Sequence, residues 1–68
     1  MSNTAKVIEL VGNSSESWEH AAQSALNDAD ETLEDITGIK IVSQTATVEN
    51  GQIDQYKSVL HVSFQLQR

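Results

Sequence analysis

The first patterned stretch of the chain alternates apolar and polar side chains. Over residues 5–11, AKVIELV, Ile8 and Leu10 would lie on one side of an extended backbone. The other side would carry Val7, Glu9 and Val11. A period of two residues is that of a β-strand, whose successive side chains face opposite sides. We therefore expect a strand over residues 5–11 that ends at Gly12.

The spacing changes to three and four residues over 13–36, NSSESWEHAAQSALNDADETLEDI, which predicts one amphipathic helix. Ser14 is placed to cap its N-terminus. Trp18 is expected to anchor the helix to the sheet. The apolar stripe is mostly alanine, so a sheet could approach it closely. The stripe consists of Trp18, Ala22, Ala25, Ala29, Leu33 and Ile36, flanked by Ala21 and Leu26.

Two further alternating runs surround Asn50-Gly51, which indicates a β-hairpin over residues 38–66. Asn-Gly favours a type I′ turn because both positions need a positive φ. The turn fixes a register that pairs Val48 with Ile53, Val42 with Val59, Ile41 with Leu60 and Ile39 with Val62. One face, expected to pack on the helix, then carries Ile39, Ile41, Leu60, Val62, Phe64 and Leu66.

The opposite face of the hairpin is partly apolar, and the chain has no second helix to cover it. In this register it carries Gly38, Lys40, Val42, Gln44, Ala46 and Val48, opposite Ser63, His61, Val59, Lys57, Gln55 and Ile53. An exposed apolar sheet face usually marks an interface. We therefore expect a β-α-β-β protomer that associates with copies of itself.

The length of the chain supports the same expectation. Its 68 residues correspond to a single domain, residues 1–68. A core of this size seldom supplies more than about 3–5 kcal/mol of stability. There is no cysteine, so disulfides and thiolate metal sites are excluded. Oligomerisation is the remaining stabiliser, with a bound ion as a second option.

The formal net charge of -6 argues against two classes of partner. Nucleic-acid binding needs a basic surface that displaces counterions from phosphates, and four scattered Lys and Arg residues do not form one. Anionic membranes are disfavoured for the same reason. No apolar run approaches the roughly 20 residues of a membrane span, and the start, MSNTAK, lacks the apolar region of a secretion signal. We expect a cytoplasmic protein.

Three segments together resemble the dodecin family, and the resemblance covers essentially the whole chain. They are KVIELVGNSSESWEHAA, ADETLEDI and YKSVLHVSFQL. The resemblance implies an α+β protomer, with a three-stranded antiparallel sheet wrapped around one helix, that assembles into a hollow homododecamer. Many dodecins bind flavins such as riboflavin or FMN, stacked in pairs at subunit interfaces, and store or shield them.

The resemblance also identifies the positions that would form a flavin site. The family tryptophan that stacks on the flavin corresponds to Gly38, in DITGIKIV, and the glutamine that hydrogen-bonds the flavin corresponds to Lys57, in QYKSVL. Basic residues that meet phosphates in some members correspond to Thr45 and Gln65. Glycine offers no ring for stacking, and lysine accepts no hydrogen bond. We therefore expect flavin binding to be weak or absent.

Divalent cations are the alternative ligand. A branch of the family that lacks the tryptophan and has a basic residue in place of the glutamine includes a calcium-binding member. In this chain Asp28, Glu31 and Asp35 are spaced to share one helix face. Their carboxylates suit calcium or magnesium. The segment is not an EF-hand, because Leu33 stands where that loop needs glycine. The other interpretation is a solvated acidic face.

Glu9 is a second candidate ligand, because copies of it could converge on a symmetry axis. Its alternative role is a pair with Lys6 or Lys57. The two histidines, His20 and His61, lie on different elements and lack the companions of a zinc site.

No catalytic constellation is visible. Ser14, Ser15 and Ser17 precede His20, but no third residue orients that histidine in the sequence. We expect a binding or storage protein, or alternatively a shell with a structural or cation-buffering role, and not an enzyme.

Overall fold

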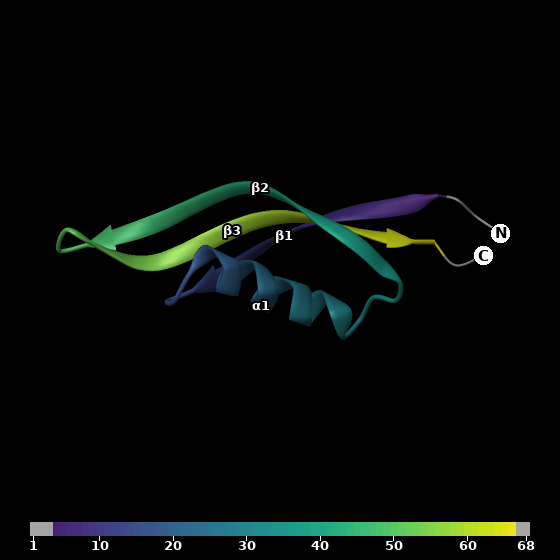
Figure 1. Cartoon of the computed structure of the whole chain (residues 1–68), viewed down its shortest axis with the longest axis horizontal. Coiled ribbons are helices and arrows are strands. Elements are labelled where there is room, and N and C mark those ends of the chain that lie inside the picture. Colours follow the sequence, from purple (N-terminus) through teal and green to yellow (C-terminus); the bar gives the residue numbers. More distant parts are fainter. Residues whose placement is uncertain (1–3, 67–68) are drawn as a thin grey trace.

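Four elements follow one another in the computed structural model, which describes residues 4–66 (Figure 1). They are strand β1 (Ala5–Ser14), helix α1 (Trp18–Asp30), strand β2 (Ile36–Glu49) and strand β3 (Gln52–Gln65). The three strands form one antiparallel sheet in the order β1-β3-β2, so the last strand of the chain is the central one. The expected β-α-β-β protomer of the α+β class is confirmed. Within residues 4–66, no helix is long and apolar enough to cross a membrane.

Strand β1 runs through Gly12 to Ser14, so the expectation that Gly12 ends it was wrong. Gly12 is buried where α1 crosses the strand. A Cβ atom at this position would collide with the carbonyl oxygen of Ala21 and lie 2.9 Å from its carbonyl carbon. The glycine therefore allows the helix backbone to touch the strand.

Ser17, not Ser14, caps the helix. Its Oγ accepts a hydrogen bond from the backbone N–H of His20 at 3.0 Å. Ser14 ends β1, and its Oγ accepts from the backbone N–H groups of Glu16 at 2.9 Å and Ser17 at 3.4 Å. Ser14 thus holds the turn between strand and helix, and the cap follows three residues later.

The helix ends at Asp30, six residues before the expected end at Ile36. The backbone N–H groups of Thr32 and Leu33 both donate to the carbonyl of Ala29, at 3.1 and 2.9 Å, which closes the last turn. Asp35 then has a φ of 56°, in the left-handed region that ends regular structure. Ile36 begins β2 and packs against the core from there, which explains why it matched the helical stripe.

The hairpin turn has the expected conformation, with positive φ at Asn50 and Gly51. The pairs Val48–Ile53, Ile41–Leu60 and Ile39–Val62 are confirmed. The pairing of Val42 with Val59 was wrong, because Ser43 lies opposite Val59. An extra residue between Ile41 and Ser43, a β-bulge, shifts the register by one.

The bulge exchanges the faces of the residues that follow it, as far as a further register shift between Thr47 and Val48. Gln44 and Ala46 pair with Ser58 and Tyr56, not with Lys57 and Gln55 as expected. Because paired residues share a face and β3 alternates, Gln44 and Ala46 lie on the side of the helix. Thr45 moves to the opposite side, where it pairs with Lys57.

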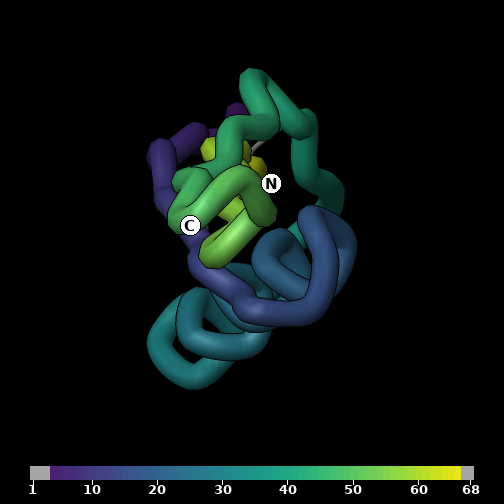
Figure 2. The backbone as a smooth tube through the Cα atoms, turned by 90° about the vertical axis from the view of Figure 1, so that its left-hand side faces the viewer, coloured from purple at the N-terminus to yellow at the C-terminus, as the bar shows by residue number. Residues whose placement is uncertain are grey.

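The core lies between α1 and the strands β1 and β3. Figure 2 shows the helix on one side of the sheet only. The buried cluster is small and contains Ala25, Leu60 and Val62, with Ile8, Leu10 and Ile36 packed against it. Ile39 and Ile41, expected against the helix, remain 42% and 41% exposed, so β2 is only partly covered.

Trp18 ties the helix to the far part of the sheet, as expected. Its Nε1–H donates to the carbonyl of Thr45 at 2.8 Å. Its ring meets that of Tyr56 edge-on, with centroids 4.9 Å apart. The hydroxyl of Ser58 donates to the Trp18 carbonyl at 2.9 Å. Trp18 therefore acts as a structural anchor between the helix and the sheet.

Candidate ligand-binding face of the sheet

The face of the sheet turned away from α1, here called the outer face, is built from rows of residues across the three strands. Directly paired residues in an antiparallel sheet lie side by side on one face. Alternate residues of β3 therefore define the rows. In order they are Asn13–Lys57–Thr45, Val11–Val59–Ser43, Glu9–His61–Lys40, Val7–Ser63–Gly38 and Ala5–Gln65.

All of the positions that the family resemblance assigned to a flavin lie on this outer face. They are Gly38, Thr45, Lys57 and Gln65. An unbroken register would have put Thr45 on the helix side, so the bulge at Val42 brings it there. The Gln65 side chain donates to the carbonyl of Thr4 at 3.3 Å and is engaged within its own protomer.

Gly38 has space around it within the protomer. It pairs with Ser63, whose hydroxyl donates to the Gly38 carbonyl at 3.2 Å. Among residues 4–66, a Cβ atom at position 38 would meet only the Ser63 Oγ, at 3.7 Å, an ordinary contact. In contrast to Gly12, none of these residues requires a glycine here.

Glu9 pairs with His61. Glu9 Oε1 lies 2.8 Å from His61 Nε2 across β1 and β3, so the expected pair with Lys6 or Lys57 was wrong. The partner was missed because the two residues are 52 positions apart and meet only through the strand order. Lys40 pairs with His61 from the other side, which completes a polar row.

The acidic residues after the middle of α1 do not form the expected helix face. Asp28 is in the helix, Glu31 follows its last residue, and Asp35 lies beyond the turn. In the part of the chain that the structure describes, no three His, Asp or Glu side chains come close enough to hold a metal ion. A single protomer therefore does not gather the candidate ligands Asp28, Glu31, Asp35 and Glu9.

The expectation that no third residue accompanies Ser14 and His20 was wrong, because Glu16 also approaches the histidine. Ser14 Oγ lies 2.8 Å from His20 Nδ1, and Glu16 Oε2 lies 3.6 Å from His20 Nε2. Ser14 is only 7% exposed, and its oxygen already accepts two backbone N–H groups. Its hydroxyl hydrogen is therefore directed at His20 Nδ1. The cluster fixes the strand-to-helix turn and does not present a free nucleophile.

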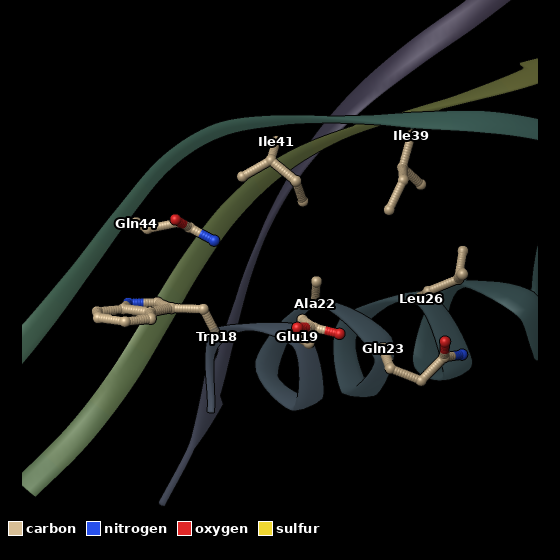
Figure 3. A pocket seen from close by; sticks show the side chains of 8 residues that line it. All are labelled: Trp18, Glu19, Ala22, Gln23, Leu26, Ile39, Ile41 and Gln44. Carbon is tan, nitrogen blue, oxygen red and sulfur yellow. The ribbon is translucent and has the colours of Figure 1, made fainter. Parts of the chain in front are cut away.

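A groove of about 230 Å³ lies between α1 and β2, where the helix leaves that strand uncovered. Figure 3 shows Ile39 and Ile41 pointing from β2 toward the helix, with Trp18 at one end. The lining is Trp18, Glu19, Ala22, Gln23, Leu26, Ile39, Ile41 and Gln44. It is mainly apolar, with amides and one carboxylate at its rim.

Comparison with known proteins establishes the family to which the chain belongs. The sequence model of the dodecin family matches residues 4–67, so the chain belongs to the dodecin family. It is 34% identical over 61 residues to calcium dodecin from Mycobacterium tuberculosis, covering 90% of this chain and 86% of that protein. It is also 34% identical over 67 residues to dodecin from Thermus thermophilus, covering 98% and 97%.

Solved structures agree with this assignment. The structure of dodecin from Streptomyces coelicolor matches with a TM-score of 0.93 at 29% identity, over 100% of this chain and 99% of that one. The crystal structure of calcium dodecin from M. tuberculosis, described as calcium-chelating with a novel calcium-binding site, matches with a TM-score of 0.82 at 35% identity. That match covers 96% of this chain and 93% of the other. The recognition of the family from the sequence is confirmed.

Proposed function

We propose that the protein is a cytoplasmic dodecin-type shell, a hollow homododecamer of one domain per chain, that binds or stores a small ligand on its outer face and performs no chemistry. Membership of the dodecin family supports this proposal. The outer face adds a physical reason for assembly, because Val7 and Val11 are 54% and 57% exposed in the protomer. Burying them between copies would add the apolar contacts that the small core lacks.

The composition of the outer face argues against tight flavin binding, and Gly38 is the observation that carries the proposal. A flavin there would find no ring on which to stack, and aromatic pairs contribute about 0.5–1.5 kcal/mol beyond area burial. Lys57 donates hydrogen bonds but accepts none. The site would thus have lost both of its specific contacts to flavin.

Riboflavin titration tests this proposal. The wild type should quench riboflavin fluorescence weakly or not at all. The double variant Gly38→Trp, Lys57→Gln should bind about two- to tenfold more tightly and quench strongly, because an indole at position 38 restores stacking. A Cβ atom at position 38 makes no clash with the described residues of the protomer.

The matched control is Gly38→Ala, Lys57→Gln, which restores the amide without the ring and should quench little. Tight, strongly quenched riboflavin binding by the unaltered protein would contradict the proposal, since it would require stacking elsewhere.

A second candidate function is binding of calcium or magnesium, which the similarity to a calcium dodecin favours. Because the carboxylates of one protomer do not converge, such a site needs side chains from more than one copy. Two groups qualify, the acidic segment with Asp28, Glu31 and Asp35, and Glu9 where copies meet around an axis.

Thermal unfolding distinguishes these possibilities, since an ion that binds only the folded state raises its stability. Millimolar calcium should raise the melting temperature more than sodium chloride of equal ionic strength does. Loss of the shift in Asp28→Asn, Glu31→Gln, Asp35→Asn would locate the ion at the acidic segment, and loss in Glu9→Gln would locate it at the axis. Equal melting temperatures in calcium and in chelator would contradict cation binding and would mean that the acidic residues form a solvated surface.

A further inference from the structure

Charge is distributed unequally between the two sides of this acidic protein. The rows of the outer face contain two lysines, Lys40 and Lys57, and a single carboxylate, Glu9, which His61 engages. The helix and its flanking turns carry most of the acidic residues. They are Glu16, Glu19, Asp28, Asp30, Glu31, Glu34 and Asp35. In a chain of net charge -6, the outer face is therefore the surface on which an anion meets the least repulsion.

Lys57 occupies an unusual place on that face. Lysines on an edge strand commonly protect it from pairing with other sheets. Lys40, on the edge strand β2, fits that role. Lys57 lies on β3, which is paired on both sides, so edge protection does not account for it. Among the residues that the structure describes, Lys57 forms no ion pair with a carboxylate.

Both neighbours of Lys57 in its row can donate hydrogen bonds. Asn13 on β1 and Thr45 on β2 lie directly opposite it, and all three residues are exposed. Side chains so placed have Cβ atoms about 4.5–5.5 Å apart. The row thus presents an amide, an ammonium and a hydroxyl together. The carboxylate of Glu9 belongs to a row roughly 13 Å further along the strand, at about 3.3 Å per residue.

The next row supplies an apolar surface beside these donors. Val11 and Val59 lie two residues along their strands from Asn13 and Lys57, on the same face. A ligand with its anionic group at Lys57 would extend its apolar part over these two valines, at the interface where copies of the protomer meet. The indole N–H of Trp18 donates to the carbonyl of Thr45, which ties this part of β2 to the helix.

We propose that Lys57, Asn13 and Thr45 form an oxyanion subsite, which binds the carboxylate or phosphate group of a small ligand whose apolar part covers Val11 and Val59. This inference rests on the proposed function of the outer face and specifies the class of ligand. The altered face recognises an acid, whereas the family flavin site recognises the polar edge of a neutral ring through glutamine.

Benzoate and benzamide test the subsite on the intact wild-type protein, because they share a ring and differ in charge. Equilibrium dialysis at fixed ionic strength should show benzoate binding about three- to fivefold more tightly, as expected for an exposed charge pair. Lys57→Gln should abolish this preference. The matched control Lys40→Gln, a lysine on the same face, should retain it. Inorganic phosphate should displace benzoate from the wild type but not from Lys57→Gln.

Three results would overturn the inference. They are equal affinity for the two probes in the wild type, an unchanged preference in Lys57→Gln, and failure of phosphate to compete. Light scattering on the same samples distinguishes this failure from failure of the proposed function. Equal binding of both probes by a dodecamer would contradict the anion subsite but remain consistent with a ligand-binding shell. A monomeric protein that binds neither probe would contradict both the subsite and the proposed function.

Discussion

Alternate residues of the central strand β3 lie in opposite surroundings. Ser58, Leu60 and Val62 have no exposed surface, because they face β1 and α1. Lys57, Val59 and His61 face away and stay accessible in the protomer. Along β3 the inner face is closed within one chain, whereas the outer face needs another molecule to cover it. Substitutions on the inner face should therefore alter folding, and those on the outer face should alter assembly and binding.

The largest effect is expected on the outer face, for Val59→Asp. If this face is buried between copies, each protomer would bury an unpaired carboxylate, at a cost of several kcal/mol in principle. Light scattering should show that the proposed dodecamer disperses. Lys57→Gln, one row away, should leave it intact. A wild type that is a folded monomer at micromolar concentration would show that the outer face is not an interface at all.

On the inner face, Gly12→Ala should cost about 3 kcal/mol or more of unfolding free energy. The added methyl group collides with the backbone of Ala21, and a backbone atom cannot rotate away as a side chain would. Urea unfolding followed by circular dichroism measures the loss. Gly38→Ala, on the outer face, should change stability by only about 0.5 kcal/mol. Equal losses of unfolding free energy in Gly12→Ala and Gly38→Ala would contradict the difference in packing between the two faces.

The smallest effect is expected for Trp18→Phe, which reports on the contact between the helix and the bulged part of β2. The substitution keeps a ring against Tyr56 and removes the hydrogen bond to the Thr45 carbonyl. An exposed bond of this kind is worth about 0.5–1.5 kcal/mol. Tyr56→Phe keeps that bond and should be close to neutral in the same urea titration. A loss for Trp18→Phe no larger than that for Tyr56→Phe would mean that the hydrogen bond to Thr45 contributes little to the anchor.

Several features of the candidate site followed from local patterns. The period of two residues placed Lys57, Val59 and His61 on the face away from the helix, and the Asn50-Gly51 turn fixed the pairs closest to it. The strand and turn predictions succeeded because each depends on residues near one another in the chain, where turn geometry and strand alternation decide the outcome. The assignment of Gly38 and Lys57 to a ligand site comes from the family resemblance and stays a prediction.

Other features of the site arise only from contacts between distant segments. The bulge at Val42 is not visible in the alternation of apolar and polar residues. It nevertheless pairs Thr45 with Lys57 and places Gln44 on the helix side of the sheet. The strand order β1-β3-β2 brings Asn13 beside Lys57 and Glu9 beside His61.

By itself, the sequence determined the number and order of the elements, the hairpin turn and the anchoring role of Trp18. The tertiary structure decided where α1 ends, why Gly12 must be a glycine, and which polar side chains share a row of the outer face. The physical reason is the range of the interactions. Strand period and turn conformation are set by neighbouring residues, whereas helix contact, bulge position and strand order minimise the free energy of the whole packed chain.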